Sequence, residues 1–398
     1  MVTGFLTGCL AFLLIVMIVD PITTTAGSYD VSRILSEPEL FSNEYGYRFN
    51  FAENLEWFQV SNGFRGSAGS ISSNRFYFDM DARIQAYPLE NLMMGYRFRK
   101  RESFTEEYQA NRADMALKHK SWLLGISGMT ESRKEFTEVG FLTGYVIDSD
   151  RWITSRLLWA DAIFNDKNRE ESEYVRQPFN IDLEGIWSSG MWTVMGHIDY
   201  GFKWSRQDPD LLLERQDVNG YLALRYQAKQ GMNLNLELVH RLHDHCEKPS
   251  DSEERQDNLR LYQVYLTMDF PVNEKLAGKV GVTWASVSGQ SFDLAEDDIE
   301  RIDYDPFDYT REDIAALAEI TWTPRENHSI LGRIHAGHVE SDSGTSSSYE
   351  ILSGELAGKV TLEYNWRMSR YGWITVGLTG KLSEFAFGGG NLRFSVQP

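Results

Sequence analysis

The chain has 398 residues and a formal net charge of −19, because 58 Asp and Glu residues outnumber 39 Lys and Arg. Such an acidic balance argues against nucleic-acid binding, since phosphate partners require a basic face. Aromatic residues make up 13% of the chain and include 11 Trp, a content that suits a protein in contact with membrane interfaces.

The N-terminus resembles a secretory signal. An uncharged apolar run covers residues 4–19, and Thr24-Thr25-Ala26 follows as a small-residue cleavage site, so a signal peptide is predicted over residues 1–26. Leu6-Thr7-Gly8-Cys9 also matches a lipoprotein box, but apolar residues continue past Cys9, which disfavours lipidation. After cleavage Cys246 is the only cysteine, and no intramolecular disulfide can form.

Residues 27–54 lack regular alternation and are predicted to form an N-terminal periplasmic extension or a short plug. From residue 55 to residue 398 a different pattern repeats, in segments of about 9 to 16 residues in which apolar and polar positions alternate. In one such segment Phe76, Phe78, Met80, Ala82 and Ile84 alternate with Arg75, Tyr77, Asp79, Asp81 and Arg83. Alternate side chains of a strand point to opposite faces, so each segment has one apolar and one polar face.

Tight turns and longer polar connections separate these segments. The longer connections include 66–74, 165–174, 206–215, 247–256 and the acidic stretch 290–313. The tight turns are Pro88-Leu89-Glu90, His119-Lys120, Asp148-Ser149-Asp150, Ser188-Ser189-Gly190, Lys229-Gln230-Gly231, Pro271-Val272-Asn273-Glu274, Pro324-Arg325-Glu326 and Met368-Ser369-Arg370. Together they join about eighteen strands (16–18), and an even number returns the chain to the side where it began.

Tryptophan gathers at the ends of the segments. Seven residues close to tight turns are predicted to form a girdle at one membrane interface: Trp122, Trp152, Trp187, Trp192, Trp322, Trp366 and Trp373. An indole ring prefers the headgroup level, where its apolar body and its N–H donor are both satisfied. The fold predicted is an all-β, closed antiparallel transmembrane barrel with short periplasmic turns and longer acidic extracellular loops.

On these features the chain resembles the porin-like outer-membrane β-barrels of Gram-negative bacteria, over residues 55–398. The last segment, Asn391 to Pro398, resembles the closing strand of such barrels, although it ends on Pro398 where an aromatic residue is usual. The resemblance is one of architecture and indicates no single family. It implies residence in the outer membrane, contact with lipid and lipopolysaccharide, and insertion by the barrel assembly machinery.

Charged residues are expected on the inner face in two groups. The basic group comprises Arg75, Arg83, Arg97, Arg99, Arg112 and Lys118, and the acidic group comprises Asp182, Glu184, Asp199 and Glu237. One interpretation is a transverse field that orients polar solutes. The alternative is a polar wall whose mixed charges compensate one another.

Three further features bear on whether the chain binds a metal ion or catalyses a reaction. The stretch 290–313 could form a constriction or a cation-binding loop through Asp293, Asp297, Asp298, Asp303 and Asp305, or be a solvated loop. His240, His243, His245 and Cys246 are close in sequence, but only His243 and His245 share the inner face, so no metal site is predicted. No convincing catalytic pair is present, and neither an enzyme nor a cofactor is expected.

A barrel of eighteen strands has a backbone diameter of roughly 35 Å, which side chains alone cannot fill. The function predicted is an outer-membrane pore for ions or polar solutes. One alternative is an export pore for a secreted polysaccharide, working with a periplasmic scaffold. Another is a sheath around a partner such as a multihaem cytochrome, which would supply its own haem because this chain has no Cys-x-x-Cys-His motif.

Overall fold

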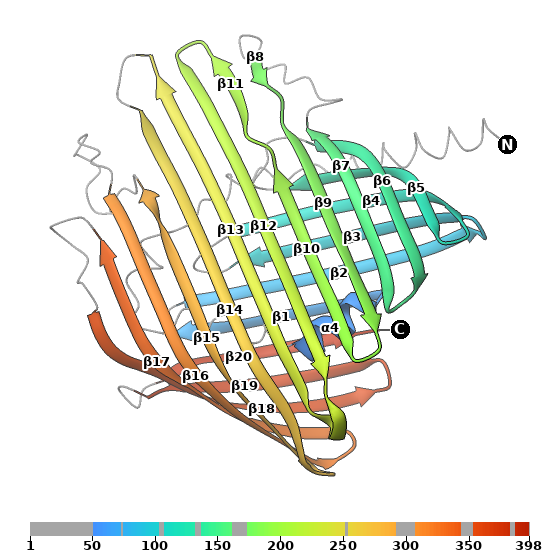
Figure 1. The fold of residues 1–398 in the computed structure, drawn as a ribbon, viewed down its shortest axis with the longest axis vertical. Helices are drawn as coiled ribbons and strands as arrows, with labels where there is room; N and C mark the ends of the chain where they lie inside the picture. The colour runs from blue at the N-terminus through green and yellow to red at the C-terminus, as the bar shows by residue number, and fades with distance from the viewer. Residues whose placement is uncertain are drawn as a thin grey trace.

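The computed structural model describes residues 51–72, 75–102, 107–131, 137–160, 173–250, 254–291, 307–343, 353–382 and 387–397. These residues form a closed antiparallel β-barrel of 18 strands with one short helix (Figure 1). The barrel closes because β1 pairs with β20 from Phe64 opposite Val396 to Ser70 opposite Gly390. The predicted fold class and the strand count are confirmed.

The chain order begins with the helix α4 (Phe51–Gln59). A 3₁₀ turn, η1 (Lys229–Gly231), joins β12 and β13. The strands are β1 (Gly63–Ser72), β2 (Arg75–Leu89), β3 (Leu92–Glu102), β4 (Glu107–His119), β5 (Trp122–Glu131), β6 (Thr137–Asp148), β7 (Arg151–Ala160), β8 (Glu173–Arg176), β9 (Phe179–Ser189), β10 (Trp192–Gly201), β11 (Trp204–Asp208), β12 (Leu211–Gln227), β13 (Asn233–Pro249), β14 (Arg255–Asn273), β15 (Leu276–Ser291), β16 (Phe307–Arg325), β17 (His328–Ser343), β18 (Ser353–Ser369), β19 (Gly372–Lys381) and β20 (Phe387–Val396).

The two shortest strands, β8 and β11, are continuations of β9 and β10 and do not add to the ring of eighteen. β8 pairs with β11, and β11 pairs with β12, so the three elements prolong the wall beyond β9 and β10. The break between β8 and β9 falls at Gln177-Pro178. Proline has no backbone N–H to donate to a ladder, which explains why pairing is interrupted there.

The predicted tight turns lie where the structure reverses the chain. Positive φ angles occur at four of these positions, at Lys120 (55°), Gly190 (60°), Gln230 (68°) and Gly231 (78°). Strands extend farther into the predicted loops than expected, since β1 occupies most of 66–74, β12 begins at Leu211 and β16 begins at Phe307. Cross-strand backbone pairing outweighs the polar composition of these stretches, which is why composition alone misplaces their ends.

The strands β12 to β18 are unusually long, with 16 to 19 residues each. About 9–11 residues are enough for a tilted strand to cross the hydrocarbon core, so this part of the wall projects beyond a bilayer. The opposite part, from β3 to β7, has strands of 10 to 13 residues. The wall is therefore taller along β12 to β18 than along β3 to β7.

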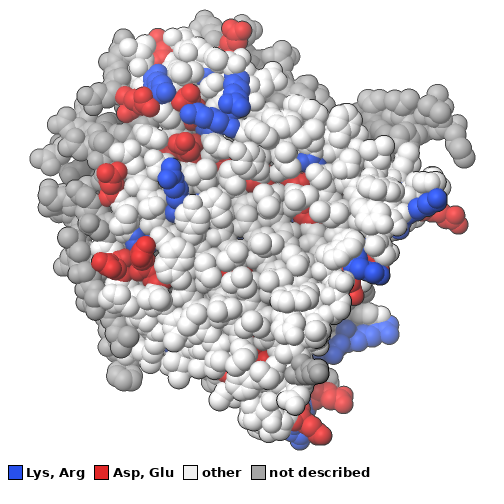
Figure 2. Space-filling view, in the orientation of Figure 1, with Lys and Arg blue, Asp and Glu red and all other residues white. Residues whose placement is uncertain are grey.

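The outer surface is apolar and the inner face is polar, the reverse of a soluble protein. Large side chains such as Phe76 (73% exposed) and Leu124 (66%) point outward. Figure 2 shows a broad area without charged side chains in the middle of one face, with charges gathered toward its margins. This is the polarity of a barrel whose wall lies in a lipid bilayer.

Candidate functional site in the barrel interior

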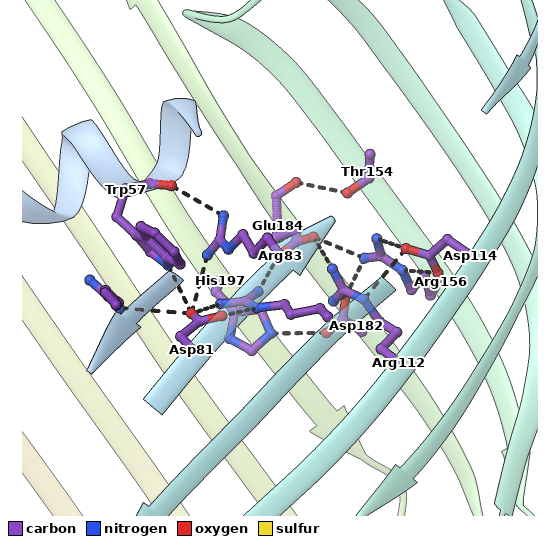
Figure 3. Close-up of polar contacts among 12 residues, drawn as sticks. Trp57, Asp81, Arg83, Arg112, Asp114, Thr154, Arg156, Asp182, Glu184 and His197 are labelled. Atoms are coloured by element: carbon purple, nitrogen blue, oxygen red, sulfur yellow. Dashed lines mark hydrogen bonds and ion pairs between the residues drawn. The ribbon is translucent and has the colours of Figure 1, made fainter. Parts of the chain in front are cut away.

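Charged side chains from β2, β3, β4, β7 and β9 meet inside the barrel (Figure 3). We refer to them as the luminal charge cluster. It consists of four arginines and four carboxylates that are linked by ion pairs, namely Arg83, Arg97, Arg112, Arg156, Asp81, Asp114, Asp182 and Glu184. The formal charges of the eight residues cancel.

Arg97 and Arg112 converge on one carboxylate from a distant strand. Arg97 Nη1 lies 3.1 Å from Glu184 Oε2, and Arg112 Nη2 lies 2.6 Å from Glu184 Oε1. Arg97 also donates from Nη2 to Asp81 Oδ2 at 2.7 Å. These contacts join β3 and β4 directly to β9.

Arg156 makes the second link across the interior. Its Nη2 donates to Asp114 Oδ2 at 2.8 Å and its Nη1 donates to Asp182 Oδ1 at 2.7 Å. His197 Nε2 lies 2.9 Å from the other oxygen of Asp182. Arg156 and Asp182 are almost completely buried. Buried charges of this kind are tolerated only when each has a partner, as here.

The link between β4 and β7 requires a tightly curved sheet, because β5 and β6 lie between them. Three interstrand spacings amount to about 14 Å along the sheet, too far for an Arg–Asp contact across a flat surface. Glycine allows the close approach of neighbouring strands at this corner. A Cβ at Gly140 would lie 1.7 Å from the carbonyl oxygen of Leu157, and one at Gly125 would lie 2.0 Å from that of Met115.

An apolar layer fills the same corner nearer the tight turns. It consists of five side chains from β3, β4, β5 and β6: Met93, Ala116, Leu123, Leu142 and Val146. Because these residues pack against one another, the corner between β3 and β7 is a small core. The basic and acidic residues of the cluster lie on top of it.

The helix α4 lies inside the barrel. Phe58 is stacked with Trp152 of β7 and with Tyr221 of β12, each at 6.4 Å between ring centroids. Leu55 packs beside Phe58 against a buried cluster formed by Ile186, Met195 and Ala223. Because β9 and β10 lie between β7 and β12, one ring can contact both strands only from the concave, inner side of the wall.

Trp57 attaches α4 to the charge cluster. Its ring is 2% exposed, and its Nε1 donates to Asp81 Oδ2 at 2.8 Å. The guanidinium carbon of Arg65 lies 4.8 Å from the ring centroid, and that of Arg83 lies 4.9 Å from it. Arg83 Nη1 also donates to the Trp57 carbonyl at 3.2 Å, which places a cation at the C-terminal end of the helix.

The opposite wall carries its own set of paired charges. Arg333 donates to Glu319 at 2.8 Å, and Lys279 lies 3.6 Å from Asp269. Further along the wall Arg393 pairs with Glu363. His335 of the same wall shares a 2.8 Å hydrogen bond with Thr283.

The predicted lumen residues are distributed as follows. Arg83, Arg97 and Arg112 form the basic half of the cluster with Arg156, and Arg99 alternates in step with Arg97 on β3. Lys118 lies near the turn with its Nζ 6.0 Å from the Tyr87 ring. Arg75 is the first residue of β2, and its side chain lies outside the described part of the structure.

The acidic lumen residues do not form one group. Asp182 and Glu184 bind the arginines of the cluster, and Asp199 lies opposite Asp182 in the ladder between β9 and β10. Glu237 lies farther along the wall and accepts a 2.7 Å hydrogen bond from the Tyr221 hydroxyl. Within the cluster the opposite charges are in direct contact and compensate one another, in keeping with the interpretation of a mixed-charge wall rather than a transverse field.

The tryptophans divide between the two faces. Trp122, Trp187, Trp192, Trp322 and Trp366 are exposed on the outer surface close to the turns. Trp152 instead faces α4 in the interior, and Trp373 follows the inner positions of β19, where Thr375 bonds to Asn365. Proximity to a turn is therefore not enough to place a tryptophan in the girdle, because the parity of the strand decides the face.

Two sequence-predicted features fall outside this arrangement. Asp293, Asp297, Asp298, Asp303 and Asp305 lie outside the described residues, whereas the last part of 290–313 belongs to β16. Within the described ranges no group of His, Cys, Asp and Glu could hold a metal ion. His243 Nδ1 contacts Asp217 at 2.7 Å, and the buried Cys246 donates to Glu254.

Several residues of the site were not singled out from the sequence. Asp81, Asp114 and Arg156 complete the cluster, and Trp57 connects it to α4. Asp81, Asp114 and Arg156 lie on the polar face of their strands, and this position could have identified them as lumen residues. Trp57 gave no such signal, because it falls at the start of the region 55–398 predicted to form strands, whereas it belongs to the helix α4.

Comparisons with known proteins agree with the architecture and go no further. No family model matches the chain, and no curated protein matches it. Solved structures with a similar fold include OccK11 (OpdR) of Pseudomonas aeruginosa, at 13% identity and a TM-score of 0.38, covering 85% of this chain and 94% of that one.

The outer membrane channel DcaP of Acinetobacter baumannii gives 10% identity and a TM-score of 0.35, covering 84% of this chain and 95% of that one. A loop-deletion mutant of OmpT, an outer membrane protein of Vibrio cholerae, gives 9% identity and a TM-score of 0.36, covering 84% of this chain and 96% of that one. At these values the likenesses carry no argument about function. Among the described residues no helix has the length and apolarity needed to cross a membrane. The strand pairing of the chain itself establishes a barrel of porin-like architecture.

Proposed function

We propose that the protein lies in the outer membrane of a Gram-negative bacterium and forms a pore for ions or small polar solutes. The observation that supports this most is the polarity of the closed wall. Apolar side chains cover the outside, while the inside carries the luminal charge cluster and the paired charges of β14 to β18. A polar inner wall inside a lipid-facing barrel is typical of the water-filled channels of porins.

The charge balance of the interior indicates which solutes would pass. Because arginines and carboxylates are paired within the cluster, neither cations nor anions meet a wall of one sign. We therefore expect weak ion selectivity rather than a dedicated anion or cation filter. The expected role is passage of solutes through the lumen, with no chemical step.

The two alternative functions gain less support. An exporter of an acidic polysaccharide needs a continuous basic path, and here carboxylates match the arginines one to one. A sheath needs a wide interior for its partner, and α4 with its aromatic contacts occupies part of that space. No observation on the described residues specifically favours either.

The test is single-channel conductance of the purified, refolded protein in a planar bilayer, with the reversal potential measured under a salt gradient. We expect discrete openings and a reversal potential close to zero. A barrel that shows heat-modifiable gel mobility, and is therefore folded, but conducts no current under any condition would contradict the proposal.

A further inference from the structure

We propose that α4 is the constriction of this pore, held at the turn end of the lumen by Trp57, and that its release widens the passage. The inference rests on the proposed pore function. It starts from where the helix lies. Gln59 Nε2 donates to Asp150 Oδ1 at 2.6 Å, and Asp150 belongs to the tight turn between β6 and β7.

The dimensions make α4 a narrowing rather than a complete seal. A ring of eighteen strands is roughly 35 Å across its backbone, and two layers of side chains reduce this to about 20 Å. A helix with its side chains is about 10–12 Å wide. The corner between β3 and β7 is already filled at the same level by the apolar layer around Leu142. The open part of the lumen at this level therefore lies beside α4.

Several described side chains near the C-terminal end of α4 attach it to the wall. Trp57 bonds to Asp81, Phe58 lies against Trp152 and Tyr221, and Gln59 bonds to the turn. The link to β1 consists only of residues 60–62, with Asn62 Oδ1 accepting from the Gln85 backbone N–H at 2.7 Å. Three residues reach about 10 Å, so α4 can swing about this link but cannot leave the barrel end.

One carboxylate joins the constriction to the charge cluster. Asp81 Oδ2 accepts from both Trp57 Nε1 and Arg97 Nη2, while Arg97 in turn contacts Glu184. A change in the cluster that moves Arg97 therefore also alters the acceptor that holds Trp57. Trp57 is therefore the position at which to disturb α4 while leaving the ion pairs of Arg97 and Arg112 with Glu184 in place, although the substitution also removes the ring that Arg65 and Arg83 face.

The experiment compares conductance in a Cys246→Ser background, which removes the free thiol of the described chain. Trp57→Ala should raise the single-channel conductance on the order of twofold and admit larger polyethylene glycols, because a helix about half as wide as the passage leaves its seat. The matched control is Trp187→Ala, which removes a tryptophan from the outer surface near the turns. It should leave the conductance unchanged.

A reversible tether tests the same point by holding α4 in place instead of releasing it. Gln59→Cys with Asp150→Cys, bridged by a short thiol-cleavable crosslinker, should hold α4 in place and give the lower conductance. In the Trp57→Ala background the tether should restore that lower value, and reduction should abolish the restoration. If the tethered and reduced proteins conduct equally in that background, α4 is not the constriction.

Thiol labelling, which does not depend on current, separates the role of α4 as the constriction from the role of Trp57 as its anchor. Leu55→Cys is partly buried in the helix contact, and its labelling by a water-soluble maleimide should become faster in the Trp57→Ala protein. Faster labelling with unchanged conductance would overturn the constriction, and unchanged labelling would overturn the anchoring role of Trp57. Folded protein in which every variant is silent would instead remove the pore function, and the constriction with it.

Discussion

Arg156 of β7 donates to Asp114 of β4 at 2.8 Å, although two strands lie between them in the sheet. The contact turns an arc of the barrel into a corner with its own packed interior. It also gives the buried carboxylate of Asp114 its closest cation, beside Arg112 at 3.4 Å. The interior of this barrel is consequently organised by contacts across the lumen as well as by neighbouring strands.

Arg156→Ala should lower the free energy of unfolding by at most about 3–5 kcal/mol, because Asp114 and Asp182 stay buried and lose their closest arginine while keeping the longer contacts with Arg112. Urea titration followed by tryptophan fluorescence in lipid vesicles measures this change. Arg151→Ala is the control, since its ion pair with Asp148 lies in solvent at a turn and contributes little. Equal, small effects of the two substitutions would show that the cluster does not stabilise the fold.

Glu184→Gln should shift ion selectivity toward anions. The substitution removes one negative charge while Arg97 and Arg112 retain theirs, so the inner wall gains a net positive charge. We expect the anion-to-cation permeability ratio to rise by about twofold, measured from the reversal potential under a KCl gradient. Arg97→Gln is the mirror variant and should shift the ratio the other way. Shifts of the same sign in both variants would contradict an electrostatic cause.

Gly140→Ala should prevent the corner between β4 and β7 from closing. The added Cβ would lie 1.7 Å from a backbone oxygen of β7, which cannot move without breaking the ladder. The expected loss is at least about 3 kcal/mol, seen as a reduced folded fraction by heat-modifiable gel mobility. Gly332→Ala is the matched substitution in another strand, where no atom lies within 4 Å of the new Cβ. It should change stability by no more than about 1 kcal/mol.

Leu378→Arg tests the orientation of the wall in the bilayer. Leu378 is 61% exposed on the outer surface of β19, and a cation near the bilayer midplane costs about 2–4 kcal/mol. Thr379→Arg places the same side chain on the next residue, which faces inward, and should cost clearly less. Both are compared by urea titration in lipid vesicles. If the substitution at position 379 is the more damaging one, the assigned faces are reversed.

Much of the fold could be predicted from local pattern. Alternation over a strand reports only which face a residue occupies, and that information is sufficient for the outer face, the strand count and the turns. The segment from Phe76 to Ile84 shows this, because its five apolar positions all lie on the outer surface. The same alternation, followed along β7 from Arg156, would have placed Trp152 on the inner face.

The contacts across the lumen could not be predicted in the same way. Whether Arg156 meets Asp114 depends on how sharply the sheet bends at Gly125 and Gly140, and alternation does not report curvature. The position of Trp57 depends on the helix α4, which occupies the start of the region predicted to form strands. For that reason the sequence identified candidate charges on the inner face, but not the partners that neutralise them.

The pairing of β1 with β20 has a consequence for assembly. The first and last strands of the barrel become neighbours only after the whole chain has been made, so the ring is completed by its C-terminal segment. α4 is joined to β1 by three residues and therefore travels with the strand that receives β20. An intermediate arrested before β1 meets β20 would leave the lumen, in which the ring of Trp57 is buried, open along the seam.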